Sequence, residues 1–256
     1  MLSRLQINNQ WLKVFKPVPN AMLRLLCLPF AGGGAQFFRD WHEYLPKSIE
    51  LCAIQLPGRE NRIREKPIMN LACLVDAIID GMNDWIGKPY AFFGHSMGAL
   101  LGYELSQAIR NAGLPQPYHL LVSGRRAPYL PQILPLIHNL PDDQFIKEIK
   151  DLNGTPNEVM ESEELLKMIM PVLRTDFMLC ETYIYNNGPP LPCSITAYGG
   201  LQDHTVSRDE VDAWRQLTTG SFTIRMFPGD HFYIQTCRSL FFRFLTHDLL
   251  TIIKDI

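Results

Sequence analysis

Short apolar runs recur along the chain, and segments with apolar residues at helical spacing lie among them. The runs span residues 23–29, 51–56, 90–93, 119–123, 194–199 and 222–227. Apolar runs of this length, bounded by proline and glycine, are typical of buried strands. Helical spacing is found in 70–86, 99–105 and 239–254. Strands that alternate with helices predict an α/β fold with a mostly parallel sheet and helices on both faces.

One long segment, residues 126–192, breaks this alternation. It contains no convincing strand, whereas apolar residues recur at helical spacing in 142–152 and in 163–185, where Pro171 interrupts the pattern. The segment follows the carboxyl end of a strand, where the active site of such a fold lies. We therefore predict a helical lid; the alternative is that these helices belong to the core. On this interpretation residues 1–256 form one domain, with a polar leader and a core at about 20–125 and 193–254.

Composition and charge exclude several classes of function. The chain has 256 residues, of which 46% are hydrophobic and 20% charged, and its formal net charge is −2. The most charged stretch, 59–66, mixes both signs, so nucleic-acid binding is not expected. No apolar run is long enough for a signal peptide or a membrane span, and we expect a cytoplasmic protein. No apolar interface stripe is evident, so we expect a monomer.

The cysteines give no sign of a disulfide framework or a metal site. All six are scattered, several lie in apolar runs, and no Cys-x-x-Cys pair occurs. This usage is typical of reduced, buried thiols in a cytosolic protein. We therefore expect neither a bound metal nor a cofactor.

The sequence GHSMG, residues 94–98, places a serine between two glycines where an apolar strand becomes a helix. Strand, G-x-S-x-G and helix together predict a nucleophile elbow, the sharp turn that exposes the reactive serine of the α/β-hydrolase fold. A Cβ at Gly94 or Gly98 would collide with the neighbouring strand or helix, so the turn needs both glycines. We expect Ser96 at the carboxyl edge of the sheet, beside the N-terminus of the next helix.

A serine hydroxyl needs a base to remove its proton and a carboxylate to orient that base. In this fold the chain order is serine, acid, histidine. His231 follows the last predicted strand and a Pro-Gly-Asp turn, so it is the expected base, with His204 as its rival. Asp203, in the loop GGLQDHTVS after the preceding strand, is the expected acid. The other nearby carboxylates are expected in a solvated loop or in the first turn of a helix: Asp230, Asp209 and Glu210.

The negative charge of a tetrahedral intermediate needs backbone N–H donors, which form the oxyanion hole. One donor is expected from Met97, the residue after the serine, and the other from the loop after an early strand. PFAGGGA, residues 29–35, is such a loop; Ala31 is the expected donor and Phe30 the alternative. A glycine run also suits phosphate, but this one lacks the lysine and serine of a phosphate-binding loop.

These motifs make the chain resemble the stand-alone (type II) thioesterases of nonribosomal peptide and polyketide synthases, in the α/β-hydrolase superfamily. The resemblance extends from about residue 25 to the last helix and rests on LPFAGGGA, QLPGRENR, FFGHSMGALLGYEL, SGRRAP, LRTDFMLCETYIY, GGLQDHTVS and FPGDHFY. It implies Ser96, Asp203 and His231 as a catalytic triad. Some relatives place the acid one strand earlier, where residues 122–125 of this chain contain no carboxylate. Gln202 departs from the many relatives that have a second acid there.

The resemblance implies a serine hydrolase acting on acyl thioesters on the phosphopantetheine arm of acyl- or peptidyl-carrier protein domains. Its implied role is to remove stalled or wrongly primed acyl groups from the synthase. Animal medium-chain acyl-carrier-protein hydrolases look similar over the same span, so release of fatty acids is the alternative.

Two further alternatives are hydrolysis of small free esters and a non-catalytic binding module, against which the intact triad argues. Four arginines are considered as docking residues for an acidic carrier protein or its phosphate, with a solvated loop charge as the alternative: Arg59, Arg62, Arg125 and Arg126.

Overall fold

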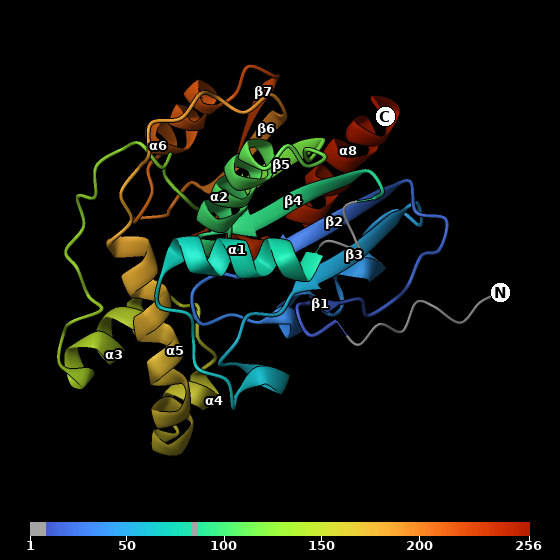
Figure 1. The fold of residues 1–256 in the computed structure, drawn as a ribbon. Coiled ribbons are helices and arrows are strands. Elements are labelled where there is room, and N and C mark those ends of the chain that lie inside the picture. The colour runs from blue at the N-terminus through green and yellow to red at the C-terminus, as the bar shows by residue number, and fades with distance from the viewer. Residues whose placement is uncertain (1–8, 83–86) are drawn as a thin grey trace.

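A seven-stranded, mostly parallel sheet forms the centre of the molecule (Figure 1). The structure is a computed structural model and describes residues 9–82 and 87–256. Within these residues the strand order is β1-β3-β2-β4-β5-β6-β7, and β1 alone runs antiparallel to its neighbour. The predicted α/β fold is confirmed. The strands are β1 (Leu12–Lys13), β2 (Leu23–Leu28), β3 (Ile49–Ile54), β4 (Tyr90–His95), β5 (His119–Ser123), β6 (Ser194–Gly200) and β7 (Phe222–Phe227).

The edge strand β1 lies in a segment that the sequence pattern predicts as a polar leader. Leu12 and Lys13 pair with Ile54 and Ala53 of β3, and the Leu12 side chain is buried. Two residues are too few to show the alternation that marks a strand, which is why the pattern misses this one. Residues 1–8 of the predicted leader lie outside the described residues.

Helices cover both faces of the sheet (Figure 1). Leu26 and Leu28 of β2 enter the core beneath α1 and α2, whereas Leu25 and Cys27 enter the core beneath α8, because successive side chains of a strand point to opposite faces. None of the helices in the described ranges is long and apolar enough to span a bilayer. The helices that flank the sheet are η1 (Ala35–Phe38), η2 (Trp41–Glu43), η3 (Glu60–Arg62), α1 (Leu71–Met82), α2 (Met97–Asn111), α6 (Arg208–Asp212), η4 (Ala213–Leu217), α7 (Tyr233–Thr236) and α8 (Arg238–Lys254).

The ends of the predicted helices differ from the pattern by a few residues. The helix predicted over 70–86 begins at Leu71, and its residues 83–86 lie outside the described part of the chain. The helix predicted over 99–105 begins two residues earlier, at Met97. Asp209 and Glu210 lie in the first turn of α6, as predicted, and Ser207 caps that helix.

The segment between β5 and β6 forms a helical layer beyond the carboxyl ends of the strands (Figure 1). Its buried side chains Phe145, Ile149 and Leu173 form a small apolar cluster that is distinct from the two cores of the sheet. This is the position predicted for a lid; the division into core and lid stays a prediction. The helices of the layer are α3 (Asp142–Asp151), α4 (Asn157–Met160) and α5 (Glu163–Glu181).

Helix α5 continues through Pro171, which contradicts the predicted interruption. Proline lacks the N–H that would bond to the carbonyl four residues earlier, and it therefore usually ends or kinks a helix. Here the residues that follow, Val172 and Leu173, are buried on the inner face of α5. Packing of this face outweighs the local penalty, as is common for helices in tertiary contact.

The first residue of β5, His119, makes the stability of the fold depend on pH. Its Nε2 lies 2.8 Å from the Thr196 hydroxyl. Burial lowers the pKa of His119 to about 4, although Asp248 and Asp255 act in the opposite direction. An unfolded histidine titrates near pH 6.5, so between about pH 6.5 and 4 the unfolded chain binds a proton that the folded chain does not.

We expect the free energy of unfolding to fall as the pH is lowered through this range, by up to about 1.4 kcal/mol per pH unit from His119. His119→Gln removes the titrating group and keeps a hydrogen-bonding side chain, so its pH dependence should be shallower. Urea denaturation of both proteins at pH 7, 6 and 5 measures the difference. Equal slopes would show that His119 is protonated in the folded protein as easily as in the unfolded one.

Candidate active site

Ser96 lies in the sharp turn between β4 and α2, with a backbone conformation that serine rarely adopts. Its φ is 53° and its ψ is −113°, and its N–H donates a 2.8 Å hydrogen bond to the Ser123 carbonyl of β5. A left-handed residue at this junction is what a nucleophile elbow requires. The structure thus places Ser96 in the strained turn predicted for it.

The turn is so tight that backbone lies against backbone. A Cβ added to Gly94 would lie 2.0 Å from the Gly98 carbonyl oxygen, and a Cβ added to Gly98 would lie 2.2 Å from the Leu28 carbonyl oxygen. Backbone atoms cannot move aside as a flexible side chain can. Both glycines are therefore required, as the sequence analysis predicts.

The structure brings Asp203 and His231 together from the loops after β6 and β7. Asp203 Oδ2 lies 2.7 Å from His231 Nδ1. An ionised carboxylate can only accept a hydrogen bond, so Nδ1 carries the proton and Nε2 is left as an acceptor. A histidine in this tautomer has the form of a general base.

Thr205, which the sequence analysis did not single out, holds the other oxygen of this carboxylate. Asp203 Oδ1 accepts from the Thr205 hydroxyl at 2.7 Å, the Thr205 N–H at 2.8 Å and the Val206 N–H at 3.2 Å. Burial by itself raises the pKa of Asp203, but the hydrogen bonds from His231 and Thr205 outweigh it, so the pKa lies below its ordinary value. Asp203 is therefore ionised at neutral pH. A hydroxyl residue two positions after the acid is the signal that the sequence offered.

The rival residues occupy other positions. His204 is exposed at the rim of a cavity. Asp230 Oδ1 accepts a hydrogen bond from the Phe232 N–H at 3.0 Å, and its Oδ2 lies 3.3 Å from Asn153 Nδ2. Glu210 completes the N-terminal cap of α6. Neither Asp230 nor Glu210 is hydrogen bonded to His231 among the described contacts.

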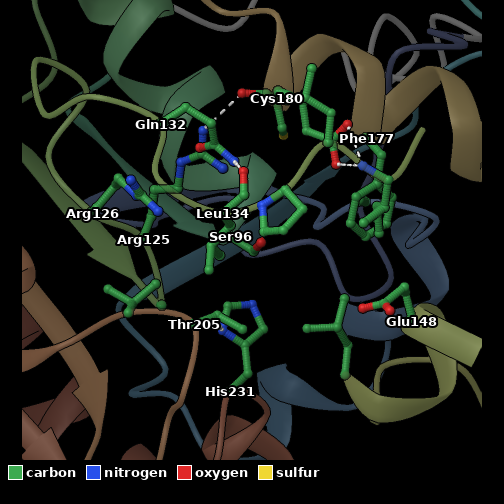
Figure 2. A pocket seen from close by; sticks show the side chains of 18 of the residues that line it. Ser96, Arg125, Arg126, Gln132, Leu134, Glu148, Phe177, Cys180, Thr205 and His231 are labelled. Carbon is green, nitrogen blue, oxygen red and sulfur yellow. Dashed lines mark hydrogen bonds between the residues drawn. The ribbon is translucent and has the colours of Figure 1, made fainter. Parts of the chain in front are cut away.

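Ser96 and His231 both line two cavities that meet at the serine. The larger has a volume of about 300 Å³; the smaller has about 30 Å³. Figure 2 shows the His231 ring directed toward Ser96 across the larger cavity, with Thr205 beside it. Phe177 of α5, in the segment between β5 and β6, lines both cavities. A substrate bound at Ser96 can thus extend into the larger cavity, whereas the smaller one has room for a few atoms only.

The glycine-rich loop forms a hydrogen-bonded turn beside these cavities. The Gly33 N–H donates to the Phe30 carbonyl at 2.9 Å, which leaves Ala31 and Gly32 at the two central positions. Gly32 has φ +77°, the value that a type II turn requires there. Ala31 lines both cavities, and Met97 is the first residue of α2, where the N–H has no partner within the helix. The two expected oxyanion donors thus stand at the two positions predicted for them, and their role stays a prediction.

A buried polar network lies behind the histidine, and the sequence analysis did not identify it. His95 Nδ1 lies 2.9 Å from the Ser123 hydroxyl, which lies 2.5 Å from the Tyr233 hydroxyl. The rings of His95 and His231 have centroids 4.9 Å apart. Burial first, and the proximity of His231 second, lower the pKa of His95 well below its ordinary value, against the opposing effect of Asp203. His95 is therefore neutral and adds no positive charge next to the base.

Three of the four arginines considered for docking are buried and ion paired: Arg59 with Asp176, Arg62 with Glu65 and Arg126 with Glu210. None of these three is a solvated loop charge. Arg125 and Arg126 line the larger cavity, as Figure 2 shows. Among the described residues, no group of three or more His, Cys, Asp or Glu side chains is placed to hold a metal ion.

Comparison with known proteins gives a consistent result. Residues 23–248 match the thioesterase domain family. The gramicidin S biosynthesis protein GrsT of Aneurinibacillus migulanus is 44% identical over 241 residues, covering 94% of this chain and 94% of GrsT. The medium-chain S-acyl fatty acid synthase thioesterase of Rattus norvegicus is 32% identical over 220 residues, covering 84% of this chain and 83% of that protein.

Solved structures agree in fold over almost the whole chain. BorB, the type II thioesterase from the borrelidin biosynthetic cluster, superposes with a TM-score of 0.85 at 36% identity, covering 93% of this chain and 96% of BorB. YbtT, the type II thioesterase from the yersiniabactin NRPS/PKS biosynthetic pathway, has a TM-score of 0.80 at 31% identity, covering 93% and 97%.

Because backbone lies against backbone at the elbow, we predict that one methyl group added there strongly destabilises the fold. Gly94→Ala should lower the free energy of unfolding by more than about 3 kcal/mol or prevent folding, because strand and helix would have to separate. At Gly87, a Cβ meets nothing within 4 Å, so Gly87→Ala should change stability by less than about 0.5 kcal/mol. Soluble yield and thermal unfolding of both variants test this. Two variants of equal stability would contradict the close packing.

Proposed function

Because this chain belongs to the thioesterase domain family, as the resemblance predicts, we propose that it hydrolyses acyl thioesters through an acyl-serine intermediate on Ser96. The observation that carries this proposal is the Asp203–His231 hydrogen bond at the wall of the cavity that also exposes Ser96. Asp203 fixes the tautomer of His231, whose free nitrogen is then available to the serine hydroxyl.

In the first half of the reaction His231 Nε2 takes the Ser96 proton as Oγ attacks the thioester carbonyl. The backbone N–H groups of Met97 and Ala31 hold the oxyanion that forms. Loss of one such donor typically costs about 100- to 1,000-fold in rate. The carbon–sulfur bond then breaks, and the proton on His231 passes to the thiolate. A thiol has a pKa of about 8.5, so it leaves more easily than an amine would.

In the second half, water enters the site and gives its proton to His231 as it attacks the acyl-serine carbonyl. The same donors hold the second oxyanion. As it collapses, the bond between the carbonyl carbon and Ser96 Oγ breaks, His231 returns its proton to Oγ, and the carboxylic acid leaves. Every step uses groups of the chain and water, so the reaction requires no cofactor and no metal.

The substrate we propose is an acyl group on the phosphopantetheine arm of a carrier protein domain. The larger cavity at Ser96 has a volume of about 300 Å³, which is more than the acyl group of a small free ester would fill.

The role that this chain's relatives support best is removal of aberrant acyl groups from a nonribosomal peptide or polyketide synthase. The gramicidin S protein GrsT is more similar to it, at 44% identity, than the rat fatty acid synthase thioesterase, at 32%. YbtT is described as a type II thioesterase of an NRPS/PKS pathway. Release of medium-chain fatty acids is the alternative.

The remaining features of the proposal concern the protein as a whole. Residues 126–192 serve as a lid over a single hydrolase domain, because their helices contribute walls to both cavities. The enzyme works as a cytoplasmic monomer in which Arg125 at the larger cavity attracts the acidic carrier or its phosphate, whereas the charge of Arg126 is paired with Glu210.

The intact mass of a carrier protein, followed after mixing with this enzyme, tests the proposal. One carrier sample holds an acetyl group and a second holds a decanoyl group. Wild-type enzyme should unload the acetyl carrier rapidly, and Ser96→Ala should slow unloading by about 10⁴-fold or more, because the attacking group is lost. Ser239→Ala, at an exposed serine of α8, is the matched control and should unload as fast as the wild type.

The two carrier samples distinguish the alternatives. Rapid loss of decanoyl but not of acetyl would favour the fatty-acid-releasing role. Hydrolysis of p-nitrophenyl acetate without unloading of either carrier would indicate an esterase. Equal unloading by Ser96→Ala and by the wild type would refute the assignment of the nucleophile.

A further inference from the structure

A buried ion pair joins helix α5, in the segment between β5 and β6, to the loop after β3. Both of its members also contact the glycine-rich loop. Arg59, in the loop after β3, donates from Nη1 to Asp176 Oδ2 at 2.7 Å and from Nη2 to Asp176 Oδ1 at 2.9 Å. Arg59 is 6% exposed and Asp176 2% exposed. Burying two charges this fully is costly unless their remaining hydrogen-bonding positions are used, so the other partners of the pair are informative.

Both members of the pair also bind the backbone of the loop that carries Ala31. Asp176 Oδ2 accepts a 2.7 Å hydrogen bond from the Gly32 N–H, and Arg59 Nη1 donates a 3.0 Å bond to the Gly33 carbonyl. The loop is thus held on one side by an anion and on the other by a cation. The peptide groups Ala31–Gly32 and Gly33–Gly34 are thus fixed by side chains from outside the loop, and the peptide between them donates to the Phe30 carbonyl.

The Ala31 N–H belongs to the peptide immediately before the one that Asp176 holds. The held peptide, between Ala31 and Gly32, is the central unit of a type II turn, and the Gly32 N–H that Asp176 binds belongs to it. The two peptides share the Cα of Ala31, so a displacement of the held peptide also displaces the expected donor. In a glycine-rich segment, such movement meets little steric resistance. An external restraint is therefore needed if the loop is to offer a donor in a fixed position.

Helix α5 touches the same loop at a second point one turn away. A Cβ on Gly32 would lie 2.4 Å from Leu173 Cδ2, and Leu173 precedes Asp176 by three residues on the same face of the helix. The apolar contact limits how close the helix comes, and the ion pair limits how far it moves away.

We infer that the Arg59–Asp176 pair positions the glycine-rich loop so that the Ala31 N–H can bind the oxyanion of the transition state. This donor is then in place only when α5 packs on the core. The inference rests on the proposed function, since it presumes that a negative charge develops on an oxygen at Ser96. Neither residue lines either of the two cavities at Ser96, so they are positioning residues and not catalytic ones. Their effect should appear in transition-state binding and not in ground-state binding.

The chain offers a matched control at a second buried Asp–Arg pair. Asp248 of α8 accepts from Arg225 through both oxygens and from the Tyr198 hydroxyl at 2.7 Å. Like Asp176 it lies on a helix, is buried and has three donors. None of Asp248, Arg225 and Tyr198 lines either cavity, and none contacts the glycine-rich loop in the described structure.

The experiment compares Asp176→Asn, Arg59→Lys and Asp248→Asn with the wild type. Arg59→Lys keeps the charge and loses the two-pronged geometry, so it remains informative if Asp176→Asn folds poorly. Three quantities are measured at a fixed pH: kcat and KM for an acetyl carrier, the Kd of an acyl trifluoromethyl ketone, and the Kd of a thioether analogue. The ketone forms an oxyanion on the serine adduct, whereas the thioether cannot.

We expect Asp176→Asn and Arg59→Lys, the two loop-side variants, to lower kcat by at least about tenfold. Loss of an oxyanion donor typically lowers the rate by about 100- to 1,000-fold, and a displaced donor should cause part of that loss. The ketone should bind more weakly by about the same factor, and KM and the thioether Kd should stay within about twofold of the wild type. Asp248→Asn should lower the melting temperature as Asp176→Asn does, and should leave kcat and both Kd values unchanged.

Two results would overturn the inference. If kcat and ketone affinity of the loop-side variants match the wild type while their melting temperatures fall as for Asp248→Asn, the pair serves stability alone. If ketone and thioether affinities fall together, the pair serves substrate binding. Failure of the proposed function is seen separately, because the wild type would then leave the acetyl carrier intact while the ketone still reports on the loop.

Discussion

The close approach of backbone to backbone between β4 and α2 is the constraint on which the rest of the site depends. Gly94 lies against the Gly98 carbonyl and Gly98 against the Leu28 carbonyl, so β4, α2 and β2 meet with no side chain between them. This contact fixes the first turn of α2, and with it Met97, next to the end of β2. The glycine-rich loop leaves β2 at the same point. One rigid junction therefore fixes the positions of the nucleophile and of both expected oxyanion donors.

The features of the site that the sequence predicts are those set by local pattern and chain order. Ser96 directly follows β4, whereas Asp203 and His231 lie in the loops after β6 and β7. The carboxyl ends of parallel strands meet at one edge of the sheet. Strand alternation and the G-x-S-x-G turn therefore suffice to bring the three loops together. The same reasoning predicts the three long helices that flank the sheet, α1, α2 and α8, because each has an apolar face at helical spacing.

The features that the sequence does not reveal depend on contacts between distant side chains. Arg59 and Asp176 are 117 residues apart, and Arg59 stands in the mixed-charge stretch 59–66, where solvated positions are the rule. Nothing local distinguishes a buried arginine from an exposed one. The neutral state of His95 likewise follows from its burial beside His231, and the passage of α5 through Pro171 follows from packing that the local preference of proline opposes.

The left-handed backbone of Ser96 has a thermodynamic consequence. A non-glycine residue with this conformation costs on the order of 1 kcal/mol or more, whereas glycine adopts it without steric strain. The fold is therefore less stable with its reactive serine than it would be with glycine in the same turn. Selection for stability and selection for turnover act in opposite directions on this one residue. A descendant of this chain that no longer needed to turn over substrate would be expected to lose the serine early and to keep the fold.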